Sequence, residues 1–99
     1  MVAREQVLQI LAAHLAEFRT LGVRELSIFG SLARGEASDA SDVDILVDYE
    51  PGTALSSFRV CELRYRVEDL LGAQVDLVTT GGLRPEIRDE ALREAISAA

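Results

Sequence analysis

Two aspartates, Asp42 and Asp44, stand two residues apart in an otherwise apolar run that ends at Val47. Side chains alternate along a β-strand, so a strand here places both carboxylates on one face and Val43 and Ile45 on the other. Like charges held this close either raise each other's pKa or share a cation. Mg²⁺ prefers oxygen ligands and takes one or two protein carboxylates together with waters and substrate phosphates. The pair therefore predicts a magnesium site for a phosphate-bearing substrate.

A glycine-serine turn, Gly30-Ser31, comes before the aspartates, with ten residues between Ser31 and Asp42. Glycine lets a ligand approach the backbone closely, and N–H groups at a helix start, together with a serine hydroxyl, donate to phosphate oxygens. Ser31 could instead be only a helix N-cap, but the downstream aspartates favour phosphate contact. Arg34 could reach a phosphate as well, although a solvated arginine beside Glu36 explains this residue equally.

A third aspartate, Asp76, interrupts the apolar segment Val75–Val78. A lone carboxylate in an apolar strand is costly to bury unless it is paired or bound to a metal. If this strand pairs beside the one carrying Asp42 and Asp44, Asp76 can reach the same face. Asp48 continues the same alternation, but it lies towards the strand end, where we expect a solvent-facing carboxylate.

Gly30-Ser31, the ten-residue spacing, Asp42-x-Asp44 and the later Asp76 together resemble the signature of the nucleotidyltransferase superfamily that includes DNA polymerase beta. From Leu26 to Ile96 the chain is similar to the minimal nucleotidyltransferases, known in prokaryotes as antitoxin partners of HEPN-domain toxins. The resemblance implies ATP as substrate and Mg²⁺ as cofactor, with two ions. It implies that Asp42, Asp44 and Asp76 are the metal-binding and catalytic residues, and that Gly30 and Ser31 bind the nucleotide. The implied reaction is transfer of AMP to a tyrosine of a cognate HEPN toxin, which silences its ribonuclease activity.

The elements that must position these residues follow from hydrophobic periodicity and turn signals. We expect an α/β (α+β) fold in which helices flank a small mixed sheet of about three strands, and the resemblance identifies this as the nucleotidyltransferase fold. The expected order is αβαβαβα. The helices are predicted at 3–21, 31–36, 54–71 and 85–97, and the strands at 23–29, 42–49 and 74–79.

The helix predicted at 54–71 carries two apolar lines. One is an inner stripe, and the other consists of Phe58, Cys61 and Tyr65. A helix with two apolar lines either lies deep in the protein or offers one line to a partner, and in so small a domain we favour the partner. The arginines of this helix, Arg59, Arg64 and Arg66, are expected on a solvated face, with contact to an anion or an acidic partner as the alternative.

Composition narrows the function classes. A length of 99 residues predicts one domain, 1–99. All ten cations are arginines, which excludes P-loop ATPases, Schiff-base enzymes and lysine-dependent ligases. The net charge of −7 argues against direct nucleic-acid binding. Cys61 is the single cysteine, so no disulfide forms within the chain. No signal peptide or membrane span is visible, so we expect a cytoplasmic protein without membrane contact.

The short chain leaves no residues for a separate domain that would hold the acceptor, so the acceptor must bring its own binding surface, most simply as a protein. Two other functions stay open. The chain could be a noncatalytic antitoxin that acts by complex formation. It could also be an adenylyltransferase for a small molecule that works with a separate helical subunit.

Overall fold

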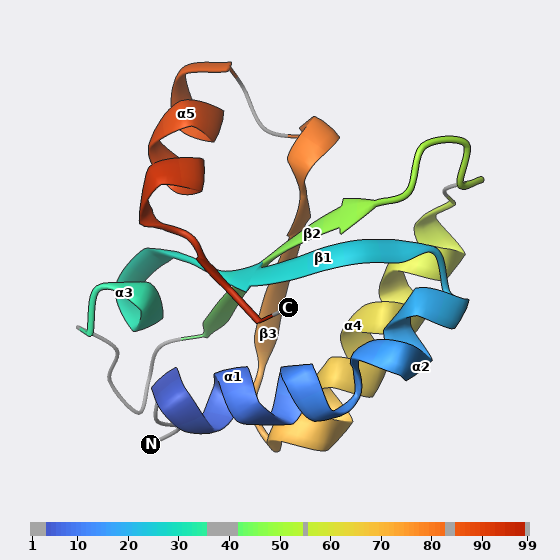
Figure 1. The fold of residues 1–99 in the computed structure, drawn as a ribbon, viewed down its shortest axis with the longest axis horizontal. Coiled ribbons are helices and arrows are strands. Elements are labelled where there is room, and N and C mark those ends of the chain that lie inside the picture. Colours follow the sequence, from blue (N-terminus) through green and yellow to red (C-terminus); the bar gives the residue numbers. More distant parts are fainter. Residues whose placement is uncertain (1–3, 36–41, 55, 83–84, 99) are drawn as a thin grey trace.

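The computed structural model describes residues 4–35, 42–54, 56–82 and 85–98. Its centre is a mixed sheet with the strand order β3-β2-β1-β4 (Figure 1). β2 runs antiparallel to β1 and parallel to β3, and β4 runs antiparallel to β1. The strands are β1 (Val23–Ile28), β2 (Val43–Tyr49), β3 (Val75–Thr79) and β4 (Ile96–Ser97).

Helices cover both faces of the sheet. Figure 1 shows α1, α2 and α4 together on one side and α5 on the opposite side. The helices are α1 (Arg4–Ala13), α2 (Leu15–Thr20), α3 (Gly30–Ala33), α4 (Ser57–Leu71) and α5 (Pro85–Glu94), with a short 3₁₀ turn, η1 (Thr80–Gly82). None of the described helices is long and apolar enough to cross a lipid bilayer.

The core lies between the sheet and the layer of α1, α2 and α4. Every second residue of β2 points into it, because side chains alternate along a strand. α1 and α2 contribute Val7, Leu11 and Phe18, all fully buried, and α4 contributes Leu63 and Val67. The apolar stripes of the sequence therefore pack as the core of a mixed sheet with flanking helices, which confirms the predicted fold class.

Two element predictions need correction at the chain ends. The predicted N-terminal helix is divided into α1 and α2 at His14, whose backbone N–H bonds to Leu11 O in a tighter turn. The C-terminal helix ends at Glu94 instead of continuing, and Ile96–Ser97 forms β4 on the free edge of β1. Strand pairing overrides helix periodicity there, because the edge of β1 offers unpaired backbone groups.

The start of α4 is also later than predicted. A helix that begins at residue 54 would have Thr53 as its N-cap, but the Thr53 hydroxyl donates to Glu50 O at 2.7 Å within the preceding turn. Ser56 is the N-cap and accepts from the Arg59 N–H at 3.2 Å. The short helix α3 begins at Gly30, and its predicted end at Glu36 lies outside the described residues.

Candidate active site

The face of the sheet turned away from the core carries the predicted site. Val43, Ile45 and Val47 point into the core, so the intervening Asp44 projects from the opposite face. Asp42 lies just before β2 and is exposed, whereas Asp44 is half-buried. Alternation along one strand thus exposes the carboxylates while their neighbours anchor the backbone in the core.

β3 brings the third carboxylate beside Asp44. In the parallel β2–β3 pair, Asp44 and Asp76 are direct register partners, and neighbouring strands in a sheet lie about 4.8 Å apart. Asp76 itself is exposed. The structure therefore shows the predicted pairing of this strand beside the one that carries Asp44. The two strands pair in parallel, and α4 connects them along the chain.

The pKa of Asp44 responds to these neighbours. Burial raises it above the ordinary value, and the charges of Asp76 and Asp42 raise it further, whereas the Arg34 guanidinium lowers it. A group whose ionised form is disfavoured by nearby carboxylates gains from a cation placed among them. The electrostatics of Asp44 therefore match those expected of a cation ligand.

The glycine-serine turn lies directly against Asp44. Gly30 has a φ of +67°, and a Cβ built on it would lie 2.4 Å from Asp44 Oδ2. The Phe29 N–H donates to Asp44 O at 3.0 Å, which fixes the turn against β2. Ser31 follows in the first turn of α3, where backbone N–H groups have no acceptor within the helix. The predicted phosphate-binding turn and the carboxylate share one location.

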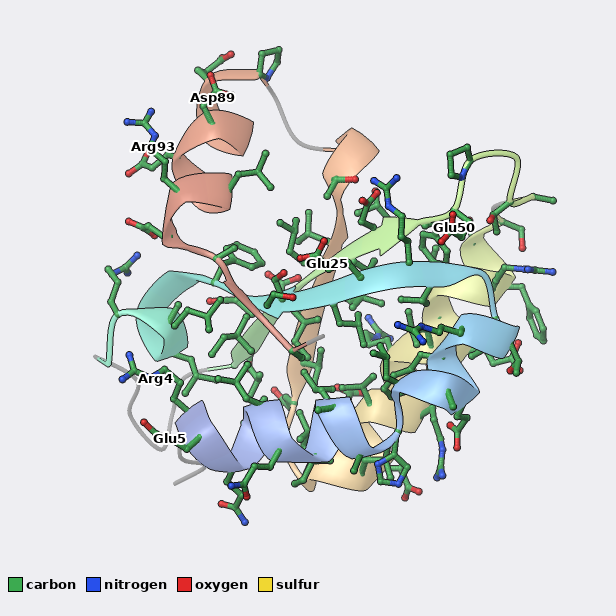
Figure 2. The ribbon with its side chains drawn as sticks, in the orientation of Figure 1. Arg4, Glu5, Glu25, Glu50, Asp89 and Arg93 are labelled. Atoms are coloured by element: carbon green, nitrogen blue, oxygen red, sulfur yellow. The ribbon has the colours of Figure 1, made fainter. Side chains whose placement is uncertain are left out.

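Two contacts across the chain hold α3 in place. Arg4 Nη1 donates to Ala33 O at 2.9 Å and ties α1 to the end of α3, and Figure 2 labels Arg4 at the start of α1. Arg34 Nη1 donates to Glu94 Oε2 at 2.9 Å and joins α3 to α5. Sequence reasoning left Arg34 open between phosphate contact and a solvated arginine, and it missed the ion pair with Glu94, because 60 positions separate the two residues and no local pattern reveals the pair.

The side chain of Asp48 is less exposed to solvent than we expected. It is half-buried, forms an ion pair with Arg24 and accepts from the Thr80 hydroxyl at 3.2 Å. It lies opposite Glu25, which Figure 2 labels, in the β1–β2 register. A pocket of about 440 Å³ opens beside Asp48, at the opposite end of β2 from Asp42. This pocket is separate from the three predicted carboxylates.

The three aspartates fit a Mg²⁺ ion whose coordination is completed by water and substrate oxygens. In the part of the chain that the structure describes, no three His, Cys, Asp or Glu side chains are grouped closely enough to hold an ion alone. The three aspartates are thus not a closed cage. Mg²⁺ is commonly bound by one or two carboxylates plus waters and substrate phosphates, and the adjoining turn is suited to phosphates. The arrangement suits a metal that is shared with a nucleotide.

Comparison with known proteins agrees with this geometry. The family model described as "Nucleotidyltransferase domain" matches residues 11–98. The protein adenylyltransferase MntA of Thermococcus cleftensis is 46% identical over 97 residues, which cover 97% of this chain and 96% of that protein. A candidate protein adenylyltransferase of Methanocaldococcus jannaschii is 37% identical, with 94% and 90% covered.

Solved structures show the same fold. A candidate minimal nucleotidyltransferase superimposes with a TM-score of 0.81 at 39% identity, covering 95% of this chain and 94% of that one. A toxin-antitoxin crystal structure with AMP-PNP superimposes with a TM-score of 0.72 at 20% identity, covering 89% and 72%, a likeness of fold alone. The match over nearly the whole chain, in sequence and in fold, shows that the protein is an enzyme of the nucleotidyltransferase domain family and resembles its minimal members.

Proposed function

We propose that this protein transfers AMP from ATP to a protein hydroxyl, with a tyrosine of a HEPN-type ribonuclease toxin as the acceptor, and so acts as an antitoxin. The observation that carries the proposal is that the glycine-serine turn and the paired aspartates lie at the same place in the fold. The backbone of Gly30 lies against the carboxylate of Asp44, and Asp44 lies beside Asp76 in the sheet. A phosphate-binding turn next to paired carboxylates suits phosphoryl chemistry on a nucleoside triphosphate.

Each residue has a role in this proposal. Asp42 and Asp44 would hold Mg²⁺, with Asp76 completing the set for a second ion, and the bound ions would neutralise charge on the triphosphate. The N–H groups of the turn at Gly30 and Ser31 hold the outer phosphates. Asp76 is exposed at the sheet edge and accepts the proton of the incoming hydroxyl.

The reaction balances without a further reactant. The acceptor oxygen forms a bond to the α-phosphorus of ATP, while the bond from that phosphorus to the bridging oxygen of the β-phosphate breaks. Pyrophosphate leaves with the electron pair, and the hydroxyl proton passes to Asp76. Positioning and charge neutralisation supply most of the rate, which a small domain can provide.

Support for a protein acceptor comes from relatives. The Thermococcus cleftensis relative, 46% identical, bears the name of a protein adenylyltransferase. One structural neighbour, at 18% identity and a TM-score of 0.65, is an MNT antitoxin in complex with a tri-AMPylated HEPN toxin of Shewanella oneidensis.

The test is the intact mass of a HEPN-domain protein from the same organism, purified and incubated with this protein, ATP and Mg²⁺. We expect a gain of one or more AMP units that disappears with EDTA and in Asp42→Ala and Asp44→Ala. Asp48→Ala is the matched control, because it removes a carboxylate from the same face of β2 at the far end of the strand. It should retain transfer.

Other outcomes identify the alternatives. If the toxin gains no mass but is inhibited equally by the wild type and by both alanine variants, the protein is a noncatalytic antitoxin. If pyrophosphate is released without any protein gaining mass, the AMP group has passed to a small molecule or to water. Either result overturns the proposed transfer to a protein.

A further inference from the structure

The outer face of the sheet, which is the face that carries Asp44, has a small hollow beside α5. The hollow measures about 60 Å³. The side chains that line it are those of Glu25, Ser27, Leu46, Asp48, Thr80 and Leu92. Leu46 is the next residue after Asp44 on this face of β2, so the hollow begins about 7 Å from Asp44 along the strand. Figure 1 shows α5, which contributes Leu92, on this side of the sheet.

The hollow has an apolar floor and an apolar rim. Leu46 is 3% exposed and forms the floor, whereas Leu92 at the rim is 47% exposed. The other strongly exposed large apolar side chains of the described residues, Phe58 and Tyr65, lie on α4, which covers the opposite face. A single exposed leucine is common on protein surfaces, so the case for a binding site depends on the polar side chains beside it.

Two polar side chains of β1 line the hollow without a partner. Ser27 is 7% exposed, and its hydroxyl has no hydrogen-bond partner among the described residues. Glu25, labelled in Figure 2, is half-buried and forms no ion pair in that part of the chain, and the nearby Arg24 is bonded to Asp48. The Asp48 carboxylate also accepts from the Thr80 hydroxyl, so it is already satisfied. Because unpartnered buried polar groups cost free energy, Ser27 and Glu25 would gain from a ligand that donates hydrogen bonds.

The size of the hollow indicates what kind of group it can hold. Pockets for small-molecule ligands measure about 300–1,000 Å³, and this hollow is several-fold smaller. It is too small for a nucleoside. The edge of one aromatic side chain, held against Leu46 and Leu92, suits it better.

The direction of the proposed reaction leads to the same place. Ser27 lies opposite Leu46 in the β1–β2 register, so Gly30 lies beyond Asp44 and the hollow lies on the other side of that aspartate. In phosphoryl transfer the attacking and leaving oxygens are roughly in line. The turn at Gly30 is the proposed site of the outer phosphates, which leave as pyrophosphate. The acceptor oxygen therefore approaches from the side of the hollow.

We propose that this hollow is the acceptor subsite and that it holds the aromatic ring of the acceptor tyrosine between Leu46 and Leu92. The phenol hydroxyl then points along β2 towards Asp44 and Asp76. A tyrosine side chain spans the distance of about 7 Å from Leu46 to Asp44, and a serine side chain does not. This inference rests on the proposed function, because it concerns the acceptor of that reaction.

The two unpartnered side chains have a role in the same subsite. Ser27 and Glu25 accept hydrogen bonds from N–H groups of the acceptor segment beside the tyrosine. They bind and position the acceptor, and neither takes part in the proton transfer.

The test measures two quantities separately, the KM for the toxin and the dissociation constant of a fluorescent ATP analogue with Mg²⁺. Leu92→Ala should raise the KM for the toxin about ten-fold, the range of an interface hot spot. The dissociation constant of the analogue and the kcat at saturating toxin should stay within about two-fold. Leu92→Met, which keeps an apolar side chain of similar size, should keep the KM of the wild type.

Ser27→Ala separates binding from stability. It removes a buried hydroxyl that has no partner, so the melting temperature should stay the same or rise. The KM for the toxin should nevertheless rise about two- to ten-fold, because the acceptor loses a hydrogen bond. Glu25→Gln should raise the same KM and leave binding of the ATP analogue unchanged.

A control on the same helix is Glu90→Ala. Glu90 is exposed and lies two positions before Leu92, on the other side of α5. This variant should keep the wild-type KM and the wild-type affinity for the ATP analogue. A toxin whose acceptor tyrosine is replaced by serine should gain no AMP.

The outcomes distinguish this inference from the proposed function. If wild type transfers AMP to the toxin but Leu92→Ala does so with an unchanged KM, the subsite is wrong and the proposed function stands. Weaker binding of the ATP analogue by Leu92→Ala would place the nucleotide in the hollow and overturn the inference, as would transfer to the serine-substituted toxin or an equal effect of Glu90→Ala. If wild type adds no AMP to any protein, the proposed function fails, and the acceptor subsite fails with it.

Discussion

Replacing Gly30 with alanine should separate folding from chemistry. Gly30 has a φ of +67°, and a left-handed conformation costs an L residue about 1–2 kcal/mol. For a domain of this size each kcal/mol lowers the melting temperature by about 4–8 °C. The backbone term alone therefore predicts a decrease of roughly 4–16 °C.

The added methyl group also acts on Asp44. It would lie 2.4 Å from Asp44 Oδ2, so reaching an ordinary contact of about 3.4 Å requires the carboxylate oxygen to move by about 1 Å. Asp44 is half-buried, and its side chain can rotate towards solvent, so the stability cost of this movement is about 0.5–1.5 kcal/mol. A misplacement of about 1 Å at a reacting centre can lower the rate about 100-fold.

The assay compares Gly30→Ala with Gly72→Ala. Gly72 has nearly the same φ, +65°, and nothing lies within 4 Å of a Cβ built on it. Both variants should lose stability in a thermal melt, Gly30→Ala by the larger amount because it also displaces the Asp44 carboxylate, but only Gly30→Ala should lose AMP transfer, by about 100-fold. If Gly30→Ala transfers AMP within about two-fold of the rate of Gly72→Ala, the contact between the turn and Asp44, the proposed metal ligand, is not required for activity.

Three further predictions concern charge and packing. Because the pKa of Asp44 is raised in the folded protein, its protonation stabilises the fold at low pH, and this stabilisation is lost as the pH rises from the ordinary pKa of 3.8 towards the raised one. Asp44→Asn should remove this pH-dependent fall in melting temperature and keep stability at pH 7, while abolishing transfer. Because Arg34 lowers the pKa of Asp44, Arg34→Gln should move the Asp44 carboxyl titration, followed by NMR without metal, to higher pH, and an unchanged titration would contradict that coupling. Leu63→Ala removes a fully buried core side chain and should destabilise the protein by about 2–5 kcal/mol in urea unfolding, whereas Leu92→Ala, on an exposed residue, should change stability by about 0.5 kcal/mol or less.

The sequence by itself determined the local geometry of the proposed site. Alternation in β2 places Val43 and Ile45 in the core and Asp44 on the opposite face, since successive side chains of a strand point to opposite sides. Gly30 was recognisable as a turn residue because only glycine adopts a positive φ readily. Helical spacing also placed Phe58 and Tyr65 on one line of α4, apart from its inner stripe.

Only the tertiary structure decided which distant segments meet. The in-register pairing of Asp44 with Asp76, the contact of Gly30 with Asp44, and the Arg34–Glu94 ion pair all join parts of the chain that no local pattern relates. The same holds for β4, where Ile96 leaves a helical pattern to pair with the edge of β1. Periodicity reports which side of an element is buried, but partners are chosen by packing of the whole core and by pairing of free strand edges.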